Sequence, residues 1–324
     1  MRVALVCSAH GFGHLTRQLA LAEGLLARGH APLVVTAAPD TVLDDYLPGV
    51  DRLPWTVDVG LVQADSLTED PAATAARVDE VCSDERIDAL AEALVGFDRV
   101  VVDLAPAGLE AARRAGVPTL AVGNFDWPWI YRHYTDLRAT AERLAAWQAG
   151  HPAAQLRPGP DLSGFSEVTE TGLLGRRRPP VRVAERAVLV SFGGLGLDDI
   201  DARLPRLDGV TWVLAAPMPR LDRPDVVYVE GVSYPALVAG ADAVLTKPGY
   251  GIHAETALAG TPVVFLDRGA FPEAPYLERA MLARGDLKLQ GSVGSALDQL
   301  WSRPRPSPAP VDDTLDRLVA LITR

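Results

Sequence analysis

The alternation of short apolar, β-branched runs with amphipathic helical stretches is the feature that most constrains this chain. In the first half the runs are RVALVCS, APLVVTA, RVVVDL and PTLAVGN, with another near SEVTETGLL. In the second half they are AVLVSFGG, VTWVLAAP, VVYVEG, AVLTKPG and PVVFLDR. Strands that alternate with helices form parallel sheets with helices on both faces. The pattern therefore predicts an α/β protein, with helices expected at 16–29 and as one long helix at 74–96, among others.

The length and one break in composition predict the domain organisation. A chain of 324 residues is long for one core, because domains usually have roughly 100 to 200 residues. The alternation stops at GRRRPPVRVAER, residues 175–186, whose arginines and prolines suit a solvated linker. We expect an N-terminal Rossmann-like domain over 1–175 and a C-terminal one over 186–302, facing each other across a cleft. Residues 303–324 should form a proline-rich spacer and a helix that packs back on the N-terminal domain through Leu315, Leu318, Val319 and Ile322.

Composition excludes several classes of protein. The formal net charge of −11 argues against a nucleic-acid binder, which needs a basic surface to neutralise phosphates. No run of about 18 apolar residues occurs, so we expect no stable membrane insertion. The first apolar run is too short for a signal peptide, and two cysteines make no disulfide framework. These features predict a cytoplasmic protein, monomeric or homodimeric.

The stretch CSAHGFGHLTR, residues 7–17, carries the strongest candidate for catalysis in the first half. It lacks the third glycine and the acidic residue of a dinucleotide-binding fingerprint. His14 should begin a helix, whose N-terminus disfavours a positively charged ring and keeps it able to accept a proton. Asp103, next to last in RVVVDL, should end its strand at the same edge of the sheet. Two interpretations stay open: Asp103 orients His14 as a general base, or the two residues cap a turn and a helix.

Two glycine-rich stretches of the second half are candidates for phosphate binding. SFGGLG places Ser191, Gly193 and Gly194 directly after an apolar strand, where backbone N–H groups can hold a diphosphate or form a plain turn. KPGYG places glycines at the mouth of a helix that contains Glu255. That carboxylate either binds both hydroxyls of a ribose or only stabilises the start of the helix.

Together these motifs resemble those of the GT-B glycosyltransferases. The resemblance spans nearly the whole chain and is strongest to two groups, the lipid-linked N-acetylglucosaminyltransferase of peptidoglycan synthesis and the N-terminal glycosyltransferase-like part of plant arabinokinases. The stretches that carry it are GFGHLTR, VVVDLAP, VGNFDWPWIY, TKPGYGIHAETALAGTPVVFLDR and FPEAPYLE. No galactokinase-like phosphate loop is present, so the arabinokinase likeness implies no sugar kinase.

The resemblance implies a nucleotide-sugar donor, with UDP or dTDP as its nucleotide, and no further cofactor or metal. His14 matches the base of inverting members and Asp103 matches its partner. The implied donor-binding residues are Ser191, Gly193, Gly194, Lys247, Gly249, Tyr250, Gly251, Glu255 and Glu273. For the acceptor, taken to be a small molecule, the candidate residues are His10, Arg17, Phe125, Asp126 and Trp127. His10 alternatively fills the turn, and the aromatic side chains alternatively belong to the core.

Two departures from the family pattern matter. Glu273-Ala274 stands where related enzymes often have Asp-Gln to hold sugar hydroxyls, and Arg17 replaces a proline and can reach a phosphate or carboxylate. We expect an inverting, metal-independent glycosyltransferase, since no Asp-x-Asp pair suited to a metal lies between the two halves. The alternatives are a nucleotide-sugar epimerase, hydrolase or phosphorylase, and a sugar-nucleotide-binding protein without turnover.

Overall fold

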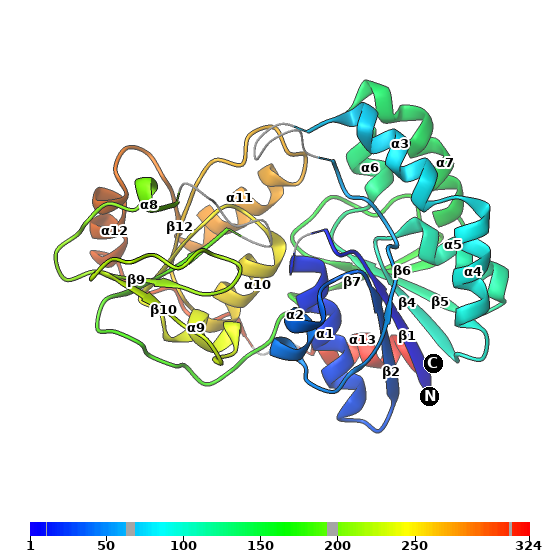
Figure 1. Ribbon diagram of the computed structural model, residues 1–324, viewed down its shortest axis with the longest axis horizontal. Coiled ribbons are helices and arrows are strands. Elements are labelled where there is room, and N and C mark those ends of the chain that lie inside the picture. Colours follow the sequence, from blue (N-terminus) through cyan, green and yellow to red (C-terminus); the bar gives the residue numbers. More distant parts are fainter. Residues whose placement is uncertain (11, 63–68, 193–199, 311–312) are drawn as a thin grey trace. The chain divides into compact units, whose positions relative to one another are not determined.

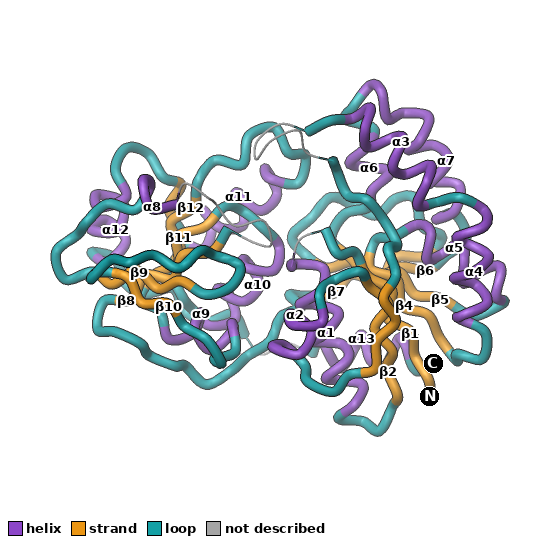
Figure 2. The backbone as a smooth tube through the Cα atoms, viewed as in Figure 1, coloured by secondary structure: helices purple, strands orange, loops and turns teal. Residues whose placement is uncertain are grey.

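The structure is a computed structural model that describes the chain except for residues 11, 63–68, 193–199 and 311–312. It divides into two compact units. Unit 1 comprises Met1–Leu174 and Asp312–Arg324, and unit 2 comprises Gly175–Val311. Figure 2 shows the strands of each unit gathered in one sheet with helices around it.

Unit 1 is built on a parallel sheet of seven strands. In space the strands follow the order β3-β2-β1-β4-β5-β6-β7, so the order reverses between β1 and β4. This is the doubly wound arrangement that the alternation predicts. The strands are β1 (Arg2–Cys7), β2 (Ala31–Thr36), β3 (Asp51–Pro54), β4 (Arg99–Asp103), β5 (Thr119–Gly123), β6 (Pro152–Leu156) and β7 (Glu167–Thr171).

Helices cover both faces of this sheet (Figure 1). Helix α13 packs against α1 on one face, and α4 packs against α5 on the other, where their leucines and alanines join the valines of β1 and β4 in one core. The helices are α1 (Phe12–Leu26), α2 (Asp40–Tyr46), α3 (Pro71–Val81), α4 (Asp84–Leu94), α5 (Pro106–Ala115), α6 (Trp127–Tyr131), α7 (Arg138–Gln148), α13 (Thr314–Ile322) and the short 3₁₀ helix η1 (Thr135–Leu137).

Unit 2 repeats the plan with a parallel sheet of six strands. Its order is β10-β9-β8-β11-β12-β13, which reverses between β8 and β11. Side chains of α8 and α12 fill one face of the sheet, and those of α9, α10 and α11 fill the other. The strands are β8 (Ala187–Ser191), β9 (Thr211–Leu214), β10 (Val226–Tyr228), β11 (Ala243–Thr246), β12 (Val263–Phe265) and β13 (Leu287–Lys288). The helices are α8 (Ile200–Arg203), α9 (Tyr234–Gly240), α10 (Tyr250–Ala259), α11 (Ala274–Arg284) and α12 (Val293–Trp301).

One part of the chain differs from the sequence prediction. The segment 175–186, expected as a solvated linker, belongs to unit 2, and Arg176 within it is buried. The proline-rich spacer also lies in unit 2, because Ala309 donates a backbone hydrogen bond to Ala257 of α10 and Arg305 Nε donates one to the Gly260 carbonyl. Helix α13 alone returns to unit 1.

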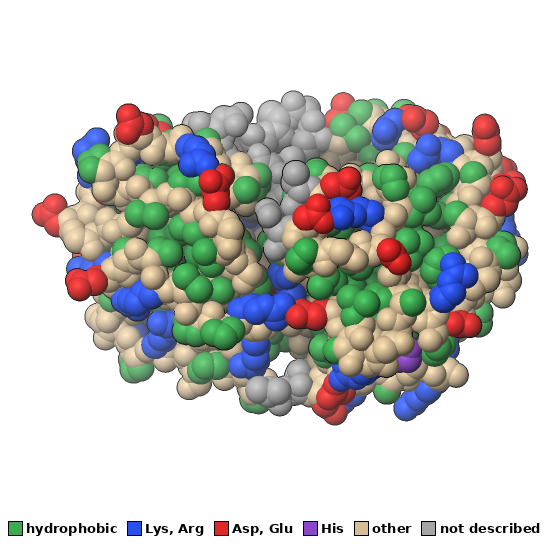
Figure 3. Space-filling model, turned by 60° about the horizontal axis from the view of Figure 1, so that its bottom comes forward, with side chains coloured by type: hydrophobic (Ala, Val, Ile, Leu, Met, Phe, Trp, Pro, Cys, Tyr) green, Lys and Arg blue, Asp and Glu red, His purple; other side chains and the backbone are tan. Residues whose placement is uncertain are grey.

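The surface of each unit carries charges of both signs. Figure 3 shows acidic and basic side chains interspersed, rather than separated by sign, on the face that it draws. No helix in the described part of the chain is long and apolar enough to cross a membrane. Cys7 and Cys82 are both free thiols.

Candidate active site

The strand order defines one candidate site in each unit. Ligands of open α/β sheets bind beyond the carboxyl ends of the strands where the order reverses. In unit 1 this point lies between β1 and β4, whose last residues Cys7 and Asp103 are paired. In unit 2 it lies between β8 and β11, whose last residues Ser191 and Thr246 are paired.

The unit 1 site brings His14 and Asp103 together. His14 lies in the first turn of α1, and its Nδ1 atom is 3.0 Å from Asp103 Oδ1 at the end of β4. Both side chains are buried, although His14 keeps a small exposed fraction of 10%. The contact is the one that a general base with an orienting carboxylate requires.

Arg17 is the third member of this cluster, and its place differs from the sequence prediction. Its Nε and Nη2 atoms each donate a hydrogen bond of 2.5 Å to a different oxygen of Asp103. Nη1 donates to Asn124 Oδ1 at 2.7 Å, and Nη2 also lies 2.9 Å from His14 Nδ1. Because the guanidinium is only 2% exposed and bound internally, Arg17 holds the dyad in place rather than facing an acceptor.

The pair with Arg17 keeps Asp103 charged inside unit 1. Burial alone raises the pKa of the Asp103 carboxyl, but the charge and the hydrogen bonds of Arg17 outweigh burial, so this pKa lies below its usual range. Gln18 Nε2 donates a further hydrogen bond of 3.2 Å to Oδ2. Asp103 is therefore a fixed anion beside the His14 ring.

The backbone after Asp103 is strained. Leu104 adopts a φ of 60°, in the left-handed region that non-glycine residues rarely occupy. Its side chain is buried against Gly123 of β5, where an added Cβ would lie 2.0 Å from Leu104 Cδ2. Only glycine at 123 leaves room for this packing. The packing in turn fixes the backbone that carries Asp103.

The aromatic residues predicted to contact an acceptor lie inside unit 1. The ring centroids of Phe125 and Trp127 are 5.8 and 6.2 Å from that of His14. Trp127 is only 1% exposed, and Phe125 is buried as well. Asp126 is buried at the start of α6, where its Oδ1 accepts a hydrogen bond from Trp129 N at 2.7 Å. Phe125 and Trp127 thus pack around His14, Asp126 caps α6, and the assignment of these three residues to acceptor binding stays a prediction.

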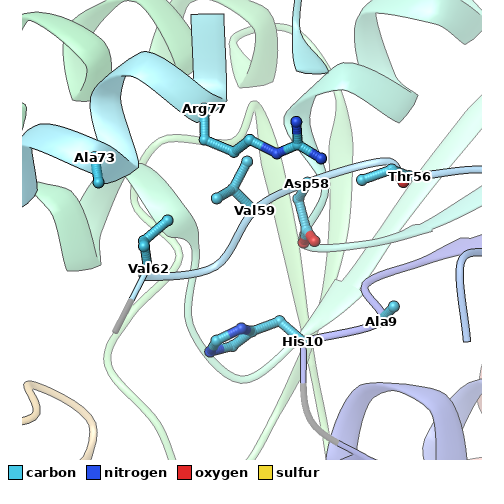
Figure 4. A pocket seen from close by; sticks show the side chains of 8 residues that line it. All are labelled: Ala9, His10, Thr56, Asp58, Val59, Val62, Ala73 and Arg77. Carbon is cyan, nitrogen blue, oxygen red and sulfur yellow. The ribbon is translucent and has the colours of Figure 1, made fainter. Parts of the chain in front are cut away.

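A pocket of about 530 Å³ opens in unit 1, and Figure 4 shows His10 and Asp58 on its wall. Asp58 was missed by the sequence analysis. Ser8 Oγ donates to its Oδ1 at 2.8 Å, and Trp127 Nε1 donates to its Oδ2 at 3.0 Å. Burial raises the pKa of Asp58 to about 6. The available signal was a lone charge in the apolar stretch LPWTVDVGLV, residues 53–62, which begins in β3.

The predicted donor residues of unit 2 surround the ends of β8 and β11. The Tyr234 hydroxyl donates a hydrogen bond to Ser191 Oγ, and Thr246 Oγ1 donates to the Ser191 carbonyl. Gly249 is the N-cap residue of α10, and it has no side chain that could accept hydrogen bonds from the first N–H groups of this helix. Lys247 is half-buried, and burial lowers the pKa of its ammonium group. Tyr250 and Gly251 form the first turn of α10.

Glu255 lies buried in α10, only 4% exposed. The nearest cation is Arg176, whose Nη2 atom is 3.7 Å from Glu255 Oε1. That distance is too long for a hydrogen bond, and Oε1 has no hydrogen-bond partner among the described residues. Burial raises the pKa of Glu255 to about 7 despite the charge of Arg176. The oxygen is an acceptor that a ligand hydroxyl would satisfy.

Two further donor predictions have different outcomes. Glu273 is buried, its Oε2 accepts a hydrogen bond of 2.9 Å from Arg268 Nη1, and its contact with sugar hydroxyls stays a prediction. Gly193 and Gly194 lie outside the described residues.

Comparisons with known proteins define the fold. The chain matches solved glycosyltransferase structures over its whole length and has the GT-B fold, with two Rossmann-like units. One is the spinosyn forosaminyltransferase SpnP, with a TM-score of 0.65 and 18% identity over 100% of both chains. Another is Arabidopsis thaliana UGT89C1 complexed with UDP-L-rhamnose, with a TM-score of 0.61 and 13% identity over 99% of this chain and 93% of that one.

Sequence comparison gives one particular likeness. The chain is 29% identical over 309 residues to L-arabinokinase of Arabidopsis thaliana. The match covers 86% of this chain but only 29% of that protein, so the chain spans less than a third of its length. No protein-family model matches the sequence.

Proposed function

We propose that this protein transfers a sugar from a UDP- or dTDP-linked donor to a hydroxyl of a small-molecule acceptor, with inversion at the anomeric carbon. The observation that carries the proposal is the 3.0 Å contact between His14 Nδ1 and Asp103 Oδ1, at the point where the strand order of unit 1 reverses. The GT-B fold supports it, and the glycosyltransferase UGT89C1 is described as complexed with UDP-L-rhamnose.

In this mechanism Nδ1–H of His14 donates to Asp103, and Nε2 accepts the proton of the acceptor hydroxyl. The acceptor oxygen forms a bond to the anomeric carbon as the bond from that carbon to the diphosphate oxygen breaks. The electron pair of the broken bond leaves on the diphosphate. Asp103 stabilises the imidazolium that forms, since its carboxylate stays charged.

On the donor side, the N-terminus of α10 and Lys247 take the charge of the leaving diphosphate without a metal ion. Glu255 Oε1 accepts a ribose hydroxyl, which gives that buried oxygen its hydrogen bond. A second candidate function, donor binding without turnover, is favoured by the position of Arg17. In the tautomer in which His14 Nδ1 accepts a hydrogen bond from Arg17, Nε2 carries the proton and the ring is no base.

A thermal-shift panel of nucleoside diphosphates and their sugars tests the proposal. A ligand that binds only the folded protein raises its melting temperature, and UDP, dTDP or one of their sugars should do so. No shift with any member of the panel would contradict the proposed function. A donor found in this way is then incubated with the protein in the absence of any acceptor. Hydrolysis or epimerisation forms product under these conditions, whereas transfer does not.

A further inference from the structure

We infer that Asp58 determines acceptor specificity, and that the acceptor is a small, neutral, polyhydroxylated molecule such as a monosaccharide or polyol. The inference rests on the proposed function and deepens it. It starts from the unit 1 pocket, whose volume of about 530 Å³ is in the range of small-molecule sites. Figure 4 shows the Asp58 carboxylate on the pocket wall, between His10 and Arg77.

Asp58 is held in place and still has capacity to bind. Ser8 Oγ and Trp127 Nε1 each donate one hydrogen bond to a different carboxylate oxygen. Ser8 is itself fixed, because its hydroxyl accepts a hydrogen bond of 3.0 Å from His10 N. A carboxylate has about four acceptor positions, so about two remain for ligand hydroxyls.

No lysine or arginine of the described residues forms an ion pair with Asp58. The basic side chain that shares its pocket, Arg77, is half exposed and pairs with Glu80 instead. A carboxylate that is oriented by neutral donors and forms no ion pair with these side chains has acceptor positions left for further hydrogen-bond donors. Hydroxyl groups of a bound molecule are such donors.

The rest of the lining selects a neutral ligand. An anionic ligand would meet the Asp58 carboxylate, and a cationic one would meet Arg77, whose charge the exposed pair with Glu80 offsets only weakly. Val59, Val62 and Ala73 supply an aliphatic wall, and among the described residues that line the pocket the imidazole of His10 is the one aromatic ring. Trp127 and Phe125, the rings that a flat aromatic acceptor would need, are buried and do not line this pocket. The pocket therefore suits a polyol better than a phenol.

Trp127 connects Asp58 of this pocket with the proposed base. Trp127 donates to Asp58, and its ring centroid is 6.0 Å from that of His10 and 6.2 Å from that of His14. Gly60 helps to place His10, since a Cβ there would lie 2.3 Å from the His10 ring. Asp58 and His14 thus both contact the Trp127 side chain, one through a hydrogen bond and the other through its ring.

Saturation-transfer NMR tests the inference directly, because it detects weak binding without donor or turnover. The probes are D-glucose, D-xylose and myo-inositol, with phenol as the aromatic alternative. Wild-type protein should bind at least one of the three polyols, and Asp58→Asn should weaken that binding about tenfold or more. The amide can keep both scaffold hydrogen bonds, with its oxygen at Trp127 and its nitrogen at Ser8, so the variant should fold.

Asp51→Asn is the matched control, since Asp51 is an exposed carboxylate of β3, and it should bind like the wild type. Ser8→Ala, which removes only one support of Asp58, should show an intermediate loss. Equal binding by wild type and Asp58→Asn, binding of phenol alone, or no binding of any polyol by the folded wild type would each overturn the inference. None of these results depends on the nucleotide panel. Failure of the proposed function would appear in that panel, and failure of the present inference would appear in the NMR experiment.

Discussion

Asp103 keeps its charge inside unit 1 because Arg17 binds both of its oxygens. The same guanidinium approaches His14 Nδ1, so one side chain sets both the charge of the carboxylate and the surroundings of the proposed base. Arg17 therefore acts through Asp103 and His14 and is a positioning residue. The strained backbone at Leu104 and the small Gly123 complete the support of this cluster.

Replacing Arg17 by methionine should destabilise unit 1 strongly. The substitution leaves Asp103 as a buried charge without its cation, which typically costs roughly 3–5 kcal/mol. Urea unfolding at neutral pH measures this loss. Arg17→Lys keeps the charge but loses the paired hydrogen bonds, so it should cost less. A methionine variant as stable as the wild type would show that Asp103 does not need this cation.

Glu255 should make stability depend on pH in the opposite direction from an ordinary ion-paired carboxylate. Burial raises its pKa to about 7 in the folded state, so the folded protein holds a proton there that the unfolded chain has lost. The contribution of Glu255 to stability therefore falls as pH rises from about 4.5 to about 7.

Glu255→Gln removes this titration. At pH 8 the variant should exceed the wild type in stability by on the order of 2 kcal/mol, and near pH 4 the two should be similar. Chemical unfolding at a series of pH values gives the difference. A constant difference across the series would contradict the assigned burial cost. The variant should also bind the nucleotide donor more weakly, because the amide replaces the ribose-binding carboxylate.

At the scale of elements, α13 is the segment that ties the end of the chain to unit 1. It packs against α1, where a Cβ on Gly24 would lie 2.9 Å from Leu315 Cδ1. Thr314 Oγ1 accepts a hydrogen bond of 3.0 Å from Gly172 N, and Arg99 Nε donates one to the Ile322 carbonyl. These contacts make α13 part of the folded unit rather than a loose tail.

Leu318→Ala should therefore destabilise unit 1 by roughly 2–5 kcal/mol, the usual cost of removing a fully buried leucine side chain. Arg317→Ala, an exposed position on the same helix, is the control and should change stability by less than about 1 kcal/mol. Both are measured by urea unfolding. Equal effects of the two substitutions would show that α13 contributes no buried contact.

Some elements differ from those expected from the pattern. The single helix expected over 74–96 is two helices, α3 and α4, because Ser83 between them is extended. The signal was present, since Ser83 followed by Asp84 and Glu85 is typical of a helix start. Helix α1 also begins earlier than the expected 16–29, at Phe12, and His14 lies in its first turn.

At the scale of the whole molecule, the two doubly wound sheets were predictable because alternating strands and helices admit few arrangements. The approach of His14 to Asp103 followed from the same rule, since carboxyl ends of parallel strands meet at one edge. Asp58 and Arg176 were not predicted to matter because they lie in irregular segments, whose position depends on packing alone. Arg17 was misplaced because its partners Asp103 and Asn124 are 86 and 107 residues away.

The central claim is that His14, oriented by Asp103, removes a proton from the acceptor. The most direct measurement is the transfer rate of His14→Ala with a donor identified by the thermal-shift panel. The variant should lose roughly 10² to 10⁴-fold in rate, the usual contribution of a general base, while its affinity for the donor stays unchanged. Turnover by His14→Ala equal to that of the wild type would contradict the account.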